Sequence, residues 1–112
     1  MALVVYTPKP KTLLSAIYKA IDDKKIDTWL YDGDGDFTHE PPQWRNKAWL
    51  RPHVMDGMLQ IGLLGEKNVQ LTKPVYGVFH GRFIEMLLTH FDDSFSTATA
   101  TAQKETGVDS FK

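Results

Sequence analysis

The sequence predicts an α+β fold, in which a mostly antiparallel sheet of about five strands carries two helices packed on one face. Three observations support it: apolar residues recur at helical spacing in two places, short runs of β-branched and aromatic residues lie between them, and an Asp-Gly dipeptide favours a tight hairpin. A chain of 112 residues corresponds to one domain. We expect that domain to span residues 1–102, followed by a flexible C-terminal tail at residues 103–112.

The first helix is predicted at residues 11–26. Its apolar residues recur every three or four positions, which places them on one side of a helix. These residues are Leu13, Leu14, Ile17, Ala20 and Ile21. Thr7 and Thr12 each lie beside a proline that suits a first helical turn, so both are candidate N-caps.

Strand patterns follow this helix. Residues 28–31 are β-branched and aromatic and end in an acidic turn, after which residues 37–39 are expected to return as a hairpin partner. A second hairpin is predicted around Asp56-Gly57, because this dipeptide accepts the positive φ angles of a two-residue turn. Its register sets Leu50, Pro52 and Val54 opposite Leu63, Ile61 and Leu59 on an apolar face. Pro52 lacks an amide, so its strand should border the sheet there.

The remaining elements are predicted from changes in periodicity. Residues 69–71 and 75–79 are expected to be strands, and residues 82–91 a second helix. The apolar side of that helix carries Phe83, Ile84, Leu87, Leu88 and Phe91. His90 shares this side, so we expect it to be partly buried. Residues 94–102 alternate, with Phe95 and three threonines on one side and Ser96 and three alanines on the other, and predict a last strand. A strand with so few charges is poorly protected against edge pairing with a second copy.

Composition excludes several classes of protein. Thirteen Lys and Arg against fourteen Asp and Glu give a formal charge of −1, which argues against a tail-driven nucleic-acid binder. Without cysteine there is no disulfide scaffold, thiolate zinc site or cysteine nucleophile. Residues 1–6 are largely apolar but have no basic segment before them, and Thr7-Pro8 follows at once, so we expect a soluble, cytoplasmic protein.

Asp32, Asp34 and Asp36 alternate with glycine and invite a calcium interpretation, because three carboxylates can converge on a hard cation. An EF-hand loop starting at Asp32 needs glycine at its sixth position and glutamate at its twelfth. These positions hold Phe37 and Gln43. We therefore expect an acidic turn and no metal or cofactor.

Residues 43–53 interleave aromatic and cationic side chains and form a candidate interaction face. Its members are Trp44, Arg45, Trp49, Arg51 and His53. Tryptophan and arginine often dominate contacts between proteins, which favours a protein partner. The same residue types also hold single-stranded nucleic acid, so that partner is kept as an alternative.

A second candidate site is the predicted strand-to-helix corner at His80 and Gly81. Free amides at a helix start favour an anion, Arg82 could bind it bidentately, and Glu85 lies one turn further on. Histidine titrates near neutral pH, so His80 could also act as an acid or base. This corner predicts a phosphate or carboxylate site, with or without enzymatic activity.

No catalytic motif is evident, which leaves three hypotheses in order. The first is a small, non-catalytic, protein-binding homodimer that uses the Trp44–His53 face. The second is an anion-binding protein or enzyme that uses His80, Gly81, Arg82 and Glu85. The third is single-stranded nucleic-acid binding through the tryptophans.

Overall fold

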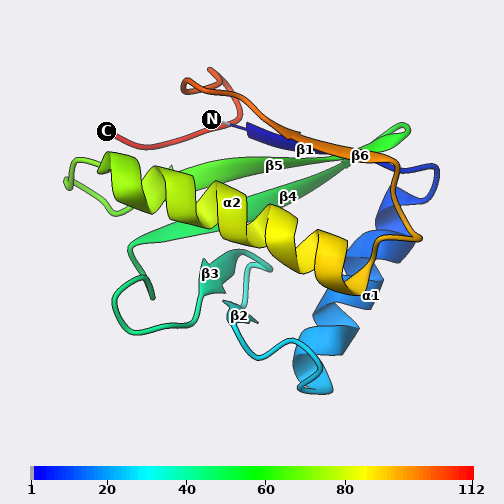
Figure 1. The fold of residues 1–112 in the computed structure, drawn as a ribbon. Coiled ribbons are helices and arrows are strands. Elements are labelled where there is room, and N and C mark those ends of the chain that lie inside the picture. Colours follow the sequence, from blue (N-terminus) through cyan, green and yellow to red (C-terminus); the bar gives the residue numbers. More distant parts are fainter. Residues whose placement is uncertain (1) are drawn as a thin grey trace.

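The computed structural model describes residues 2–112 as one sheet with two helices on one side, which confirms the α+β class (Figure 1). The elements are β1 (Ala2–Tyr6), α1 (Pro10–Asp22), β2 (Trp29–Tyr31), β3 (Phe37–His39), β4 (Ala48–Met55), β5 (Met58–Gly65), α2 (Lys73–His90) and β6 (Thr97–Ala100). The six strands lie in the order β2-β3-β4-β5-β1-β6, and all neighbouring pairs are antiparallel. The sheet thus has slightly more strands than the sequence predicts.

The extra strand is β1, which lies inside the sheet between β5 and β6. Val4 pairs with Gln60 on one side and with Thr99 on the other. A continuous apolar run of this length is consistent with a buried strand, but periodicity alone does not distinguish it from a segment of a buried helix. The strand forms because two distant segments supply backbone partners on both sides.

Helix α1 is shorter than predicted, and neither candidate threonine caps it. Lys9 occupies the N-cap position without a side-chain hydrogen bond, and Pro10 fits the first turn because it has no amide to leave unpaired. The hydroxyl of Thr7 instead accepts a hydrogen bond from the Lys9 amide at 3.2 Å and donates one to the Ser94 carbonyl at 2.8 Å. After α1 the chain reverses through Lys24, which has a φ of 60°.

The β4–β5 hairpin has the predicted register, with Leu50 opposite Leu63 and Pro52 opposite Ile61. Gly57 has a φ of 74°, as the tight turn requires. On its other side β4 pairs with β3 only between Leu50 and Phe37, so Pro52 lies where β4 has no second partner. Its missing amide therefore costs the sheet no hydrogen bond, as predicted.

Helix α2 corrects two predictions, because residues 75–79 form its first turns and no strand forms at residues 69–71. The hydroxyl of Thr72 caps it by accepting a hydrogen bond from the Val75 amide at 3.3 Å, and proline fits its first turn. The buried side chains recur at helical spacing and are Phe79, His80, Phe83, Met86 and Leu87. Burial of these rings outweighs the weak helix preference of the valines and glycine in residues 75–79.

The exposed side of α2 also differs from the prediction. Leu88 is 57% exposed and His90 is exposed, although both were expected on the apolar side. Extending the helix back to residue 73 makes Phe79 and Phe83 the centre of its buried side. The predicted apolar side was too broad because it was read from residues 82–91 alone.

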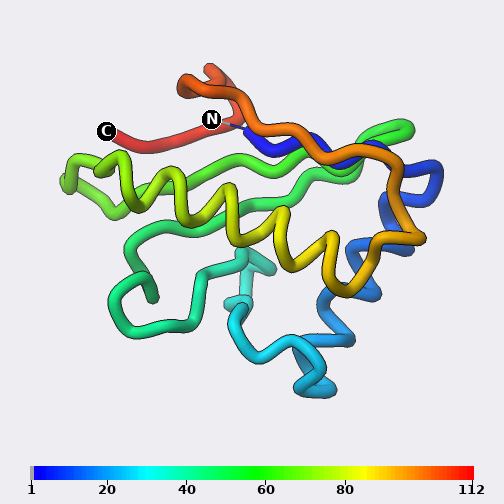
Figure 2. The backbone as a smooth tube through the Cα atoms, viewed as in Figure 1, coloured from blue at the N-terminus to red at the C-terminus, as the bar shows by residue number. Residues whose placement is uncertain are grey.

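Residues 108–112 pack against β5 and do not form the free tail expected from the sequence. Ser110 pairs with Leu64 in a parallel bridge, beyond the point at Gly62 where the pairing of β1 with β5 ends. The buried Asp109 carboxylate accepts hydrogen bonds at 2.7 Å from the amides of Leu63 and Glu105. The two ends of the chain thus lie close together along the same strand (Figure 2).

The sheet has two different faces. The covered face lies under both helices and holds one apolar core, which includes Leu3, Ile17, Ile61, Phe79 and Phe83. Among residues 2–112, no helix covers the opposite face, which we call the open face (Figure 1). Strand register and alternation assign to it Val4, Tyr6, Trp49, Arg51, His53, Gln60, Thr97 and Thr99.

Candidate functional site

A cavity of about 400 Å³ lies beside the covered face, between α2 and the end of the β2–β3 hairpin. Residues of α2 form one wall, and the loop from Pro41 to Trp44 forms another. Its polar and aromatic lining includes Asp27, Thr28, His39, Trp44, Arg82 and Glu85. Three of these residues were predicted to be functional, but in two separate sites. The structure brings Trp44, Arg82 and Glu85 together.

His39 is the most buried polar group of this lining, with 5% of its surface exposed. Its Nδ1 lies 2.8 Å from the Thr28 carbonyl oxygen, which only accepts, so Nδ1 carries the hydrogen. Burial lowers the pKa of the ring, and Arg82 lowers it further, although the hydrogen bond to Thr28 opposes this. A neutral ring with its hydrogen on Nδ1 leaves a lone pair on Nε2.

His39 was not predicted from the sequence to be a functional residue. The available signal was its place in the predicted strand at residues 37–39, two positions after Phe37 and so on the same side. In the structure its ring packs against Trp29, with ring centroids 4.6 Å apart. A histidine on the apolar side of a strand was therefore visible in the sequence, but its neighbours were not.

The predicted anion site lacks the corner on which it depended. Gly81 and Arg82 lie within α2, eight or more residues after its start, so no free amides of a helix N-terminus are present there. His80 is buried, and its ring stacks on Tyr76 with centroids 4.5 Å apart. Arg82 is exposed and donates to both carboxylate oxygens of Glu85 at 3.1 Å. His80 is thus separated from Arg82 and Glu85.

The predicted interaction face is also divided. Trp44 lines the cavity, whereas alternation along β4 places Trp49, Arg51 and His53 on the open face. The Nε atom of Arg45 donates a hydrogen bond to the Glu40 carbonyl at 3.0 Å. Trp44 is thus separated from Trp49, Arg51 and His53, which lie on the opposite side of the sheet.

Arg51 is held by a carboxylate at the acidic turn between β2 and β3. Its guanidinium donates two hydrogen bonds to Asp36, at 3.0 and 2.8 Å, and the Asp36 side chain is only 4% exposed. Such a bidentate pair fixes the side chain in one orientation. We therefore assign Arg51 a structural role in fastening this turn to β4.

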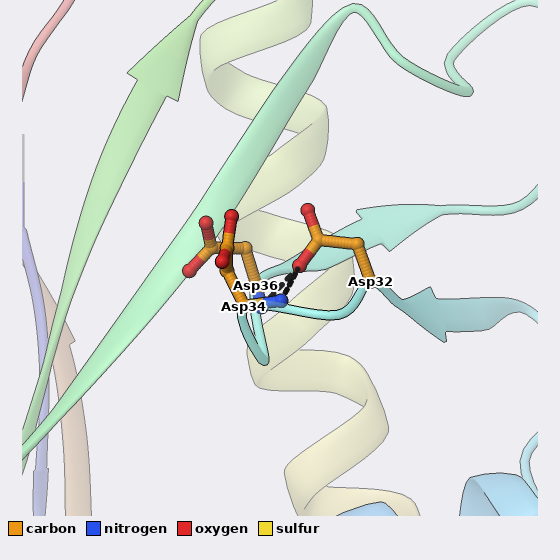
Figure 3. A group of neighbouring side chains, drawn as sticks. All are labelled: Asp32, Asp34 and Asp36. Atoms are coloured by element: carbon orange, nitrogen blue, oxygen red, sulfur yellow. Dashed lines mark hydrogen bonds between the residues drawn. The ribbon is translucent and has the colours of Figure 1, made fainter.

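The carboxylates of Asp32, Asp34 and Asp36 lie close together in the turn, with one oxygen of each within 4.8 Å of the others (Figure 3). The side chain of Asp32 accepts hydrogen bonds from the amides of Asp34 and Asp36, both at 3.0 Å. Asp36 is in turn paired with Arg51. Local hydrogen bonds thus account for two of the three carboxylates, as an acidic turn requires.

Strand β6 forms one edge of the sheet and presents only threonine and alanine. Within residues 2–112, β1 is its only strand partner. At the other edge, β2 has three residues and ends in the acidic turn. A short edge beside charges resists pairing, whereas an uncharged edge strand does not.

Comparisons with protein-family models, with curated proteins and with solved structures find no match to this chain. Across the described residues, no helix has the length and apolar character needed to cross a membrane.

Proposed function

We propose that the protein is a non-catalytic binding protein that acts as a homodimer, in which two copies pair through their β6 strands. The observation that carries this proposal is the composition of the edge strand. Residues Thr97–Ala100 contain no charge, no proline and no bulky side chain. Proteins usually prevent edge pairing with charged side chains or proline, and this strand lacks both.

The backbone of β6 supports pairing in one direction. The amide of Thr101, directly after the strand, donates to the Ala2 carbonyl at 3.0 Å. Since backbone groups of successive residues in a strand point to alternate sides, the amides of Ala98 and Ala100 point away from β1. Two copies related by a twofold axis can exchange hydrogen bonds through these groups without disturbing the existing sheet.

Pairing at β6 would also join the open faces of the two copies. Tyr6, Thr97 and Thr99 lie beside this edge, and Tyr6 is 42% exposed. Trp49 and His53 lie further in on the same face. The joined face offers aromatic and polar side chains over a wide area, which suits a protein partner. The protein partner expected from the sequence is therefore kept as part of the proposal.

A nucleic-acid partner is less well supported than a protein partner. Trp44 and Trp49 lie on opposite sides of the sheet, so they do not form one platform on which successive bases stack. The Arg51 charge is paired with Asp36. The cytoplasmic location expected from the sequence stays a prediction, which fractionation of cells expressing the tagged chain tests.

The homodimer is tested by sedimentation equilibrium of the wild-type chain and Ala100→Pro at micromolar concentration. Proline removes an outward amide and adds a ring at the edge, so the variant should be a monomer while the wild type is a dimer. Ala100→Thr is the matched control, because it keeps the amide and the preference for a strand, and should remain a dimer. A monomeric wild type, or a proline variant that dimerises equally well, contradicts the proposal.

A further inference from the structure

We propose that the cavity beside α2 binds a small, flat organic cation that carries N–H donors, such as an aromatic amidinium. His39 is more than nine-tenths buried and lines this cavity. Its Nδ1 is engaged by the Thr28 carbonyl, and no group among residues 2–112 makes a hydrogen bond to its Nε2. A ligand that donates a hydrogen bond there satisfies the one side of the ring that the fold leaves open.

The Nε2 atom of His39 is not sealed inside the protein. Among residues 2–112, the fully enclosed side-chain nitrogens do not include the His39 Nε2. The atom is therefore accessible although the residue is almost completely covered, and the cavity that His39 lines provides the access. The ring cannot turn freely, because it packs against Trp29 on one side and near Phe79 on another.

The charges of the lining favour a cation. The lining contains two carboxylates, those of Asp27 and Glu85, and one guanidinium, that of Arg82. Its formal charge is therefore −1. Arg82 is already paired with Glu85 through two hydrogen bonds of 3.1 Å, which reduces its attraction for an anion. The carboxylate of Glu85 retains lone pairs that can accept from a ligand. This charge balance differs from the anion site predicted from the sequence.

The apolar part of the lining favours a flat ring. The half-buried Trp44 supplies an aromatic surface, and Met86 and Ile26 supply apolar surface beside the polar atoms. A positively charged planar group gains a cation–π interaction with tryptophan when it lies over the ring. A volume of about 400 Å³ is ample for a single-ring compound.

Three compounds of nearly equal size and shape test the proposal: benzamidine, which is positively charged, benzamide, which is neutral, and benzoate, which is negatively charged. Each is titrated into the ¹⁵N-labelled wild-type chain at pH 7.5, and binding is followed by backbone and histidine-ring NMR shifts. We expect benzamidine to bind most tightly and to shift the signals of Thr28, His39 and Trp44. The His39 Nε2 signal should move as its lone pair accepts a hydrogen bond.

Variants locate the bound compound. Glu85→Gln removes one carboxylate from an exposed position and should weaken benzamidine binding by about fivefold, as loss of an exposed ion pair predicts. Trp44→Leu should weaken it as well. Glu105→Gln is the control, because it removes the same charge from an exposed residue outside the cavity and should leave the affinity unchanged.

The proposal is overturned if benzoate binds as tightly as benzamidine, if no compound shifts the cavity signals, or if Glu85→Gln and Glu105→Gln have equal effects. His39→Phe gives a further check by keeping a ring in the core while removing Nε2. If that variant does not fold, the comparison of Glu85→Gln with Glu105→Gln still shows whether benzamidine binds in the cavity. None of these readouts depends on the oligomeric state, so the cavity and the β6 edge succeed or fail separately.

Discussion

The covered and open faces of the sheet differ in what their side chains contribute. On the covered face, Ile61 and Leu63 have no exposed surface and belong to a core that includes residues of both helices. On the open face, Tyr6 is 42% exposed and Arg51 is held in place by an ion pair. One face therefore supplies stability through apolar burial, while exposed side chains of the other, such as Tyr6, are available for contacts.

The largest expected effect lies on the covered face. Phe83 has no exposed surface and packs between Trp29 and Phe37, with ring centroids 5.1 and 5.2 Å away. Phe83→Ala should lower the free energy of unfolding by about 3–5 kcal/mol in a denaturant titration. Leu88→Ala, on the exposed side of the same helix, should change it by less than about 0.5 kcal/mol. Equal losses in the two variants would mean that α2 does not bury Phe83.

An intermediate effect is expected where the C-terminal segment joins β5. Asp109 accepts two backbone hydrogen bonds of 2.7 Å and is buried, so Asp109→Ala leaves the amides of Leu63 and Glu105 without this acceptor. The free energy of unfolding should fall by about 2 kcal/mol. Asp92→Ala, which removes an exposed carboxylate, serves as the control. If both variants unfold at the same denaturant concentration, residues 108–112 do not stabilise the sheet.

The smallest effect concerns pH. The pKa of His39 is lowered in the folded chain by burial and lies near its ordinary value of 6.5 in the unfolded chain. The unfolded chain therefore takes up the proton first as the pH falls. The contribution of neutral His39 to the free energy of unfolding is complete above about pH 6.5. It is lost progressively as the pH falls from there to the folded-state pKa.

Denaturant titrations of the wild type and His39→Gln at several pH values check this. The free energy of unfolding of the wild type should fall more steeply below pH 6.5 than that of the variant, which has no group titrating at this position. The difference between the two curves isolates His39 from the other histidines. Parallel curves would show that His39 is as accessible to protons in the folded chain as in the unfolded one.

The β4–β5 hairpin shows which part of the fold the sequence predicts well. Its register follows from neighbouring residues alone, because Asp56-Gly57 specifies the turn and each pair is then determined by counting outward. Val54 shows the limit of this reasoning. It lies on the predicted apolar face but is 47% exposed, because the hairpin extends beyond the helices that cover its base.

Strand β1 and helix α2 show why the rest could not be predicted. β1 is specified by partners that lie at least 52 residues away in the chain, as in the pair of Tyr6 with Met58 (58 − 6 = 52). Residues 75–79 have the valine and aromatic content of a strand, yet they join α2 because Phe79 completes the core beside Trp29. Local preference was overruled in both places by contacts that depend on the folded arrangement.

The candidate site shows the same limitation. Trp44, Arg82 and Glu85 were selected from the sequence for their chemistry, but their assignment to one cavity depends on how α2 lies across the hairpin. The sequence did not indicate His39 as a site residue because its role requires the Thr28 carbonyl at its Nδ1 and Trp29 opposite it in the hairpin. Residue type indicated which groups can bind, and tertiary structure determined which groups meet.

The position of β1 also has a consequence for the time course of folding. The first strand of the chain pairs with β6, which is among the last segments to be synthesised, and the Ala2 amide donates to the Thr101 hydroxyl at 2.9 Å. Contacts between such distant residues require closure of nearly the whole chain as a loop, which slows folding. While the chain is still being made, the outer edge of β1 therefore lacks its native neighbour, β6.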